Sequence, residues 1–398
     1  MNNFFKRNFS NWFSNYENLC RINKLNHNQK KVLIELLRDE IRSQVRFKNV
    51  PEHAPQMHLF DFYLNEIAGE LLHLAQGNKF YFSASTLSAE ANSIFKNRFS
   101  LPKLTEDIQK LKQDGYIKAP FILSKKQISE IIEALSPFHF KAKWMPFMEM
   151  RGSELINLIE EKNFPNIDKG DTFWLEDQNN FARSLPIFEI ATDPFIVSYV
   201  GEYFGCMPIL VQANSWFSFP SKLEKKNLSE NAHFFHQDKE FIKFLKVFIY
   251  LNDVGEENGP HCYIEGSHLD TMKLHGIPFS ERVMDEDIEK YYSKVRIKNI
   301  LAPAGTVIFA DTSCAHKGQP IKNGARIILQ LEYASSLHLS GNRPFESIST
   351  AYTKKLPYES IDLQRLLKNF DSTLRVQFDN LTSPNIFFSI LNKVQKYF

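Results

Sequence analysis

Apolar residues recur at helical spacing in the first part of the chain. One stripe comprises Val32, Leu33, Leu36, Leu37, Ile41 and Val45, and a second comprises Leu64, Ile67, Leu71, Leu72 and Ala75 before a stop signal at Gly77. Thr105 can cap a further short helix that ends near Gly115, and Ser124 with Gln127 forms a capping-box pattern. The spacing predicts a helical N-terminal region and a helical segment leading into the rest of the chain.

From about Met207 onward, short apolar and β-branched runs are separated by turn residues. The candidate strands are Met207 to Ala213, Phe244 to Asn252, His261 to Ile264, Val295 to Leu301, Thr306 to Ala310 and Arg326 to Tyr333. Many short strands with no regular helix between them favour a sandwich or barrel, here a jelly roll. The charged interval 269–294 is long enough to be helical or to form a mobile cover over one end.

Helix-like spacing returns near the C-terminus, at Ile361, Leu363, Leu366 and Leu367. We therefore divide the chain into a helical N-terminal region (1–105), a strand-rich domain (106–345) and a helical C-terminal extension (346–398). The predicted fold class is α+β, with a jelly-roll core between helical flanks.

Composition and charge exclude several classes of partner. Lys and Arg number 48 against 46 Asp and Glu, so no basic field argues for nucleic acid. The longest near-apolar run, FLKVFIYL, contains Lys246 and is far shorter than the roughly 18 residues of a membrane span. The start of the chain lacks the apolar stretch of a secretory signal. Because the four cysteines are also widely scattered, we expect a cytoplasmic protein.

Three residues point to a metal site. In an extended segment His236 and Asp238 leave the same side of the backbone, so both can bind one ion. A lone His-x-Asp pair is more often a surface histidine near an acid. His316, which follows the run TVIFA and a short polar loop, offers a third ligand and so favours a metal site. Two imidazoles and one carboxylate suit non-haem Fe(II) and leave coordination positions open for substrates.

Arg326 lies ten positions after His316, at the start of the run RIILQLEYA. A guanidinium at the mouth of a small barrel can clamp a carboxylate through two parallel hydrogen bonds, which lysine cannot reproduce. This arrangement favours a dicarboxylic cosubstrate. The alternative interpretation of Arg326 is an exposed strand-edge arginine.

Four other histidines compete as ligands: His233, His261, His268 and His275. His233 lies off the alternation that joins His236 to Asp238, and His268 ends a Gly-Ser-His turn. We expect all four to lie behind the ligands or at the surface. Asn258, Gly259 and Pro260, like Gly266 and Ser267, are interpreted as turns that orient the strands.

With these motifs, the sequence resembles the phytanoyl-CoA dioxygenase family of Fe(II)- and 2-oxoglutarate-dependent oxygenases. Four blocks carry the resemblance: DGYIKAPFILSKKQISEIIEAL from Asp114, HQD from His236, LNDVGEENGPHCYIEGSH from Leu251 and GTVIFADTSCAHKGQPIKNGAR from Gly305. It covers about residues 110 to 335 and implies a double-stranded β-helix (jelly roll, cupin-like) core. Departures are Phe235 where Trp is common, Glu265 where Pro is common, and Gly318, which lacks a hydroxyl that some members use.

Carried over by position, the resemblance makes His236, Asp238 and His316 the iron ligands and Arg326 the partner of the distal 2-oxoglutarate carboxylate. Gln212 is a looser candidate for contact with this cosubstrate. The implied cofactors are Fe(II), 2-oxoglutarate and O2. Halogenating relatives have a small residue at the position of Asp238, so the resemblance implies a hydroxylase.

The resulting hypothesis is a dioxygenase that hydroxylates an aliphatic C–H bond of a small organic or conjugated metabolite, with release of succinate and CO2. The first alternative is a catalytically inactive jelly-roll module that uses the N-terminal region as a contact surface. The second is a cupin-type isomerase or metal hydrolase, which does not explain Arg326. The sequence identifies neither the substrate nor the oligomeric state.

Overall fold

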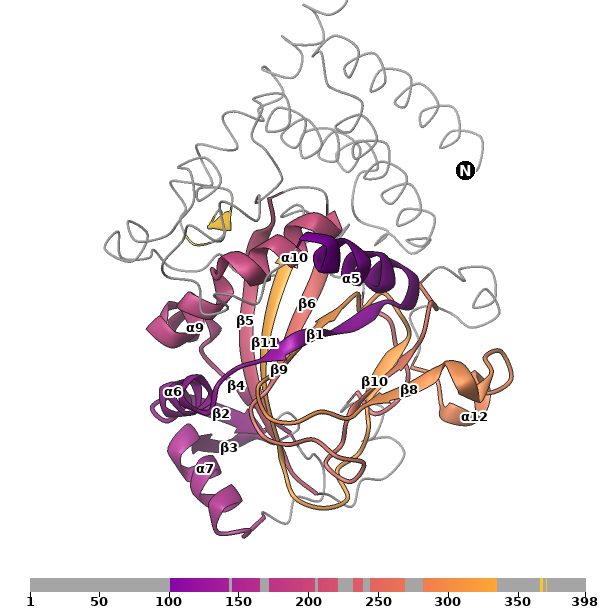
Figure 1. Cartoon of the computed structure of the whole chain (residues 1–398). Helices are drawn as coiled ribbons and strands as arrows, with labels where there is room; N and C mark the ends of the chain where they lie inside the picture. The colour runs from indigo at the N-terminus through magenta and orange to yellow at the C-terminus, as the bar shows by residue number, and fades with distance from the viewer. Residues whose placement is uncertain are drawn as a thin grey trace, which may run out of the picture.

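A computed structural model describes most of the chain between residues 101 and 334 (Figure 1). The described ranges are 101–142, 145–164, 172–204, 207–220, 232–238, 244–268 and 282–334, with Leu366, Leu367 and Phe370. The expected helical regions 1–105 and 346–398 lie almost entirely outside these ranges, so the proposed division of the chain stays a prediction.

Two of the predicted helices are present. The expectation that Thr105 caps the first helix was wrong, because that helix begins at Leu101 and Thr105 lies inside it, whereas Ser124 caps the second as expected. α5 spans Leu101–Asp114 and α6 spans Lys125–Leu135. At the start of α6 the Gln127 N–H donates to Ser124 Oγ (3.3 Å), and the Ser124 N–H donates to Gln127 Oε1 (2.9 Å). This reciprocal capping box satisfies two donors that a helix N-terminus otherwise leaves without partners. Among the described residues, the other helices are α7 (Gly152–Glu160), α8 (Gln178–Arg183), α9 (Leu185–Ala191), α10 (Pro194–Phe204), α12 (Asp285–Ile288) and the 3-10 helix η2 (Lys294–Arg296).

The strands form two antiparallel sheets. The eight-stranded sheet has the order β1-β9-β6-β11-β5-β4-β2-β3, and the three-stranded sheet has the order β10-β7-β8. The large sheet contains β1 (Tyr116–Ile122), β2 (His139–Ala142), β3 (Met145–Arg151), β4 (Thr172–Leu175), β5 (Ile209–Ser218), β6 (Phe244–Tyr250), β9 (Thr306–Ala310) and β11 (Arg326–Ala334). The small sheet contains β7 (His261–Ile264), β8 (Ile297–Ile300) and β10 (His316–Gly318).

All six predicted strands are present, as β5 to β9 and β11, and the α+β class is confirmed. The expectation of a purely helical lead-in was wrong, because β1 to β4 lie between α5 and α8. These strands obtain their partners from distant segments: β1 pairs with β9, and β4 pairs with β5. A local pattern carries little signal for such pairings.

The large sheet separates two apolar clusters and thereby creates layers. On β6, Leu245, Val247 and Ile249 belong to the cluster that packs against the helices, whereas Phe248 and Tyr250 belong to the cluster on the other face. The second cluster also contains Tyr263 and Ile300, which belong to strands of the small sheet. In Figure 1, helices such as α9 and α10 accordingly cover one side of the large sheet, and β8 and β10 lie on the other. The residues that face the small sheet are those that can form an internal site.

The second half of the interval 269–294 packs beside the predicted metal segment. Val283 forms an isolated antiparallel bridge with Phe235, and Ile288 and Tyr292 are buried in the same small cluster. Lys317 donates to both carboxylate oxygens of Asp285 at 2.7 Å. Residues 282–294 are thus partly helical and anchored, while the first half of the expected cover lies outside the described residues.

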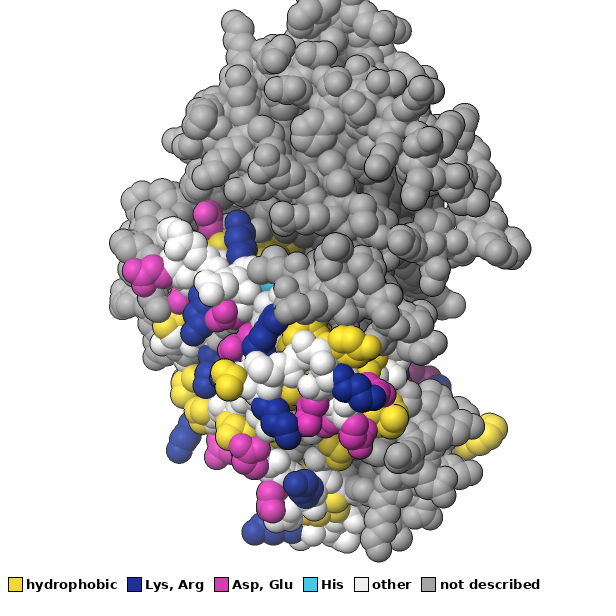
Figure 2. Space-filling view, turned by 90° about the vertical axis from the view of Figure 1, so that its right-hand side faces the viewer, with side chains coloured by type: hydrophobic (Ala, Val, Ile, Leu, Met, Phe, Trp, Pro, Cys, Tyr) yellow, Lys and Arg dark blue, Asp and Glu magenta, His cyan; other side chains and the backbone are white. Residues whose placement is uncertain are grey.

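The described part of the face in Figure 2 shows no dominant charge. On the face in Figure 2, Lys and Arg side chains alternate with Asp, Glu and hydrophobic side chains. Within the described part of the chain, no helix combines the length and the apolar character needed to cross a bilayer.

The turn between α5 and β1 requires glycine at position 115, because its φ is +89° and a Cβ there would lie 2.0 Å from Cys314 Sγ. We predict that Gly115→Ala lowers the free energy of unfolding by about 2–4 kcal/mol, through backbone strain and overpacking. Urea denaturation measures this loss. Gly255→Ala is the control, since its nearest neighbour is Asn258 Oδ1 at 3.4 Å. Equal stability of the two variants would contradict this account of the turn.

Candidate metal centre

Backbone pairing brings the two candidate histidines together. His236 and the preceding Phe235 are bridge residues in the short segment 232–238, and His316 is the first residue of β10. The N–H of each donates to the carbonyl of the other at 2.9 Å, forming an isolated antiparallel bridge. The ring centroids are consequently only 4.4 Å apart. Asp238 is fixed two residues further on, where its N–H donates to the Thr312 carbonyl at 2.9 Å.

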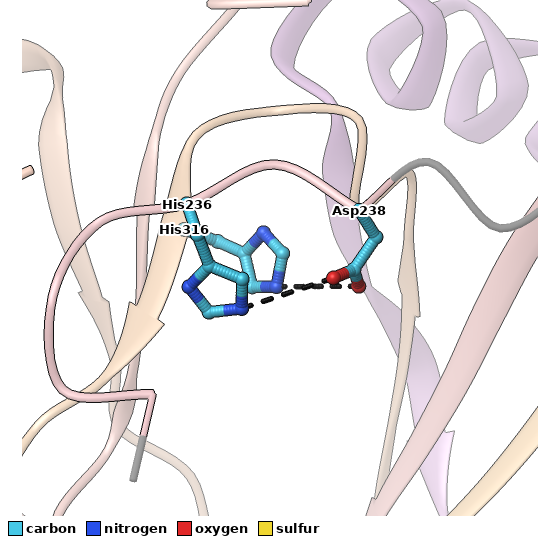
Figure 3. Close-up of side chains that lie close together, drawn as sticks. All are labelled: His236, Asp238 and His316. Atoms are coloured by element: carbon cyan, nitrogen blue, oxygen red, sulfur yellow. Dashed lines mark ion pairs between the residues drawn. The ribbon is translucent and has the colours of Figure 1, made fainter. Parts of the chain in front are cut away.

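The three side chains converge on one point, as Figure 3 shows. His236 Nε2 lies 3.8 Å from Asp238 Oδ1, and His316 Nε2 lies 3.6 Å from Asp238 Oδ2. One ligand atom from each residue lies within 4.8 Å of the other two. Atoms bound to one ion at about 2 Å are at most about 4 Å apart, so small side-chain rotations bring this set to metal-binding geometry. The expectation that His236 and Asp238 face the same side agrees with this arrangement.

Both imidazoles present Nε2 to the centre because their Nδ1 atoms face backbone carbonyls. His236 Nδ1 lies 3.0 Å from the Phe234 carbonyl, and His316 Nδ1 lies 2.9 Å from the Cys314 carbonyl. A carbonyl accepts only, so each Nδ1 carries the proton and donates it. The lone pair then lies on Nε2, which is how metal-binding histidines are generally held by their outer hydrogen bonds.

Burial and neighbouring charges favour the ligand forms of these groups. Burial, reinforced by His316, lowers the pKa of His236 to about 3, so its imidazole is neutral at ordinary pH. Burial acts to raise the pKa of Asp238, but the nearby Lys246, together with the two histidines, lowers that pKa well below its usual range. A neutral imidazole beside an ionised carboxylate is the state that a divalent cation needs.

Two charged residues that were not predicted to belong to the site lie behind Asp238: Lys246 contacts Asp238, and Glu332 contacts Lys246. Lys246 Nζ donates to Asp238 Oδ2 at 2.9 Å and lies 3.7 Å from Glu332 Oε2. Lys246 on β6 and Glu332 on β11 are direct register partners, and both are buried. The sequence held one signal for these two residues, a charged side chain inside each of two otherwise apolar strands. Charges in buried strands are rare unless they are paired.

Arg326 is buried at the start of β11, so the alternative of an exposed strand-edge arginine was wrong; its exposed fraction is 5%. Its Nη1 donates to the Gly259 carbonyl, and a Cβ built at Gly318 would lie 3.4 Å from Nη2. Gly318 and His316 lie two residues apart on the same side of β10, a separation of about 7 Å. The guanidinium is therefore within a short diacid's length of the three candidate ligands.

Gln212 lies on the inner face but away from Arg326. In the pairing of β11 with β5, Arg326 is opposite Ser218 and Glu332 is opposite Gln212, so Gln212 lies six residues along β5 from the partner of Arg326. The Gln212 Oε1 accepts a hydrogen bond from Gln330 Nε2 at 2.8 Å. Its predicted contact with a cosubstrate stays a prediction.

The competing histidines take other positions. His233 Nδ1 lies 2.8 Å from the Gly318 carbonyl, and His261 stacks on Tyr250 with centroids 5.7 Å apart. His268 is buried, with Nε2 donating to the Lys112 carbonyl at 2.9 Å. None of these three joins the cluster formed by the candidate ligands, and His275 lies outside the described residues.

The Gly-Ser-His turn orients the loop that precedes His316. Ser267 Oγ accepts the Ala315 N–H at 2.7 Å, and His268 Nδ1 accepts the Cys314 thiol at 2.9 Å. The Cys314 carbonyl in turn accepts the Nδ1–H of His316. The turn residues, interpreted from the sequence as structural, thus connect α5 to a candidate ligand through buried hydrogen bonds.

Comparisons with known proteins bear on the same residues. The model of the family described as Phytanoyl-CoA dioxygenase (PhyH) matches residues 111–327. No curated protein sequence matches the chain.

Several solved structures are similar at low sequence identity. SnoK, a non-heme alpha ketoglutarate dependent carbocyclase from nogalamycin biosynthesis, is 15% identical with a TM-score of 0.40, over 59% of this chain and 84% of SnoK. EctD from S. alaskensis in its apoform is 16% identical with a TM-score of 0.40, over 64% and 86% of the respective chains. HygX from Streptomyces hygroscopicus with nickel and 2-oxoglutarate bound is 13% identical with a TM-score of 0.35, over 57% and 86%.

The depressed pKa of His236 predicts a pH-dependent stability. The unfolded chain has a histidine pKa of about 6.5 and the folded chain about 3, so between these values the unfolded state binds the extra proton. Stability is then complete above about pH 6.5 and falls as the pH falls. We predict that chelator-treated wild type loses about 1–2 kcal/mol more stability between pH 7 and pH 5 than His236→Gln does. Chemical denaturation at both pH values measures this, and equal losses would contradict it.

Proposed function

We propose a function for this chain on one premise, that the chain belongs to the phytanoyl-CoA dioxygenase (PhyH) family. It is accordingly an enzyme of the 2-oxoglutarate-dependent dioxygenase class, which works with iron and 2-oxoglutarate. The reaction we propose is hydroxylation of an aliphatic C–H bond in a small organic or conjugated metabolite. The convergence of His236, Asp238 and His316 is the observation that carries this proposal.

The proposed ligands of Fe(II) are Nε2 of His236, the carboxylate of Asp238 and Nε2 of His316. The fit is chemical: two neutral imidazoles and one carboxylate are the donor set that leaves half of an octahedral site open for small molecules. Bound iron supplies the activation of dioxygen that the protein's own side chains lack. The retained carboxylate of Asp238 supports hydroxylation over halogenation.

In the proposed cosubstrate site, Arg326 holds the distal carboxylate of 2-oxoglutarate. A guanidinium can offer two parallel donors to a carboxylate, and position 318 is a glycine without the Cβ that would otherwise lie 3.4 Å from Arg326 Nη2. The amide of Gln212 is a further proposed contact. In the overall balance, the substrate C–H, O2 and 2-oxoglutarate give an alcohol, succinate and CO2.

The surrounding residues would exclude water and orient the substrate. Tyr263 stacks on His316 with centroids 5.6 Å apart and on Tyr116 with centroids 5.1 Å apart. Such aromatic walls keep solvent away from a reactive centre. We also propose that the two sheets close into the jelly roll of the family, with the reaction taking place between them.

Removing the carboxylate tests the proposed centre. We predict that wild type with Fe(II) and 2-oxoglutarate releases succinate under air across a panel of small metabolites, and that Asp238→Ala falls to background because one of the three ligands is lost. Succinate quantification measures both. Asp287→Ala is the control, since this exposed carboxylate on α12 pairs only locally with Lys290. Full turnover by Asp238→Ala would contradict the proposal; a wild type without iron and without succinate would favour the inactive binding module.

The proposed role of Arg326 predicts a change in cosubstrate affinity. Arg326→Lys keeps the charge but loses the paired donors, so we predict that KM for 2-oxoglutarate rises about tenfold to a hundredfold while kcat changes little. Steady-state kinetics at saturating substrate provide the measurement. Arg151→Lys, at the exposed N-terminus of α7, is the matched control. An unchanged KM in Arg326→Lys would contradict the assignment.

A further inference from the structure

A buried cation lies between a candidate metal ligand and a second carboxylate. Lys246 Nζ is 2.9 Å from Asp238 Oδ2 and 3.7 Å from Glu332 Oε2. The side chains are 7% exposed for Lys246 and 0% for Glu332. Because β6 and β11 place these two residues opposite each other, the pair is built into the register of the large sheet.

The position of Lys246 creates an electrostatic problem for a metal site. An ammonium that donates to a ligand carboxylate lies a few ångströms from the ion that the carboxylate binds, and in the interior such like charges repel strongly. Arg282 adds to the problem, because its charge also acts on His236 and on Asp238. A nearby anion is needed if the site is to attract a divalent cation.

Glu332 supplies that anion at the least accessible position of the cluster. Its carboxylate cannot reach solvent, and it lies beyond Lys246 as seen from Asp238. A buried anion of this kind is costly unless a cation compensates it. The pair is therefore neutral as a unit while keeping a hydrogen-bond donor on Asp238.

We propose that Lys246 and Glu332 are positioning residues that act on the metal centre through Asp238, an inference that rests on the proposed function. Lys246 holds Asp238 Oδ2, so that Oδ1 is the oxygen presented to the ion. Glu332 cancels the charge of Lys246, so that the site attracts a divalent cation despite the ammonium beside it.

The test is a titration with Mn²⁺ in the absence of 2-oxoglutarate. Binding is measured from the electron paramagnetic resonance signal of the Mn²⁺ that stays free in solution. Glu332→Gln, which removes the second anion beside Lys246 and leaves Asp238 to balance its charge alone, is expected to weaken binding about tenfold or more. Adding Lys246→Met removes the repulsion, so the double variant is expected to bind at least about threefold more tightly than Glu332→Gln alone. The matched control is Lys141→Met with Glu176→Gln, an exposed pair on β2 and after β4, which is expected to bind Mn²⁺ as wild type does.

The change in Mn²⁺ affinity when Lys246→Met is added to Glu332→Gln separates charge balance from a merely structural role. If the pair only supported the fold, removing both members would weaken binding as much as or more than removing Glu332 alone. Wild-type affinity in Glu332→Gln, or a double variant no tighter than Glu332→Gln, would overturn the inference. Circular dichroism establishes folding of each variant.

Two further outcomes complete the design. If Glu332→Gln does not fold, Lys246→Met is compared with the double variant. Tighter binding by Lys246→Met, which retains the Glu332 charge, supports the inference, and equal binding overturns it.

If wild type itself binds no Mn²⁺, the proposed metal centre is wrong and the inference fails with it. If wild type binds Mn²⁺ and Glu332→Gln binds it equally well, only the inference fails.

Discussion

The whole site depends on one backbone contact, the reciprocal pair of hydrogen bonds between His236 and His316. The two residues are distant in the sequence, and these backbone hydrogen bonds place their rings side by side. Asp238 follows two residues later, and a further backbone hydrogen bond, from its N–H to the Thr312 carbonyl, fixes its position. Preorganisation of this kind means that metal binding does not have to order the chain, which conserves binding free energy.

The interior between the sheets is unusual because strands that are buried on both faces carry charge. On β11 the inner positions include Arg326, Gln330 and Glu332, whereas the alternate positions pack against the helices. Each of these polar side chains costs free energy unless it is paired. The proposed function gives a reason for this cost, since a small polar molecule and an ion would use these groups, and functional sites commonly carry such locally unfavourable residues.

The sequence alone was sufficient for much of this picture, and the failures have physical causes. His236 and Asp238 could be paired because a period of two is a local property, whereas His316 was added from its place after the run TVIFA and from the resemblance to the family. The structure brings the three side chains together, and their role as iron ligands stays a prediction. The strands β1 to β4 were missed, since their partners lie far away in the chain. Lys246 was noted only as an interruption of an apolar run, because a pair with Glu332 depends on the register between β6 and β11.

Crystals soaked with Fe(II) or Mn²⁺ under anaerobic conditions, with diffraction recorded at the metal's absorption edge, test the central claim most directly. The account predicts one anomalous peak about 2 Å from His236 Nε2, His316 Nε2 and a carboxylate oxygen of Asp238. A well-ordered crystal with no peak there, or with the ion held by other residues, would contradict it.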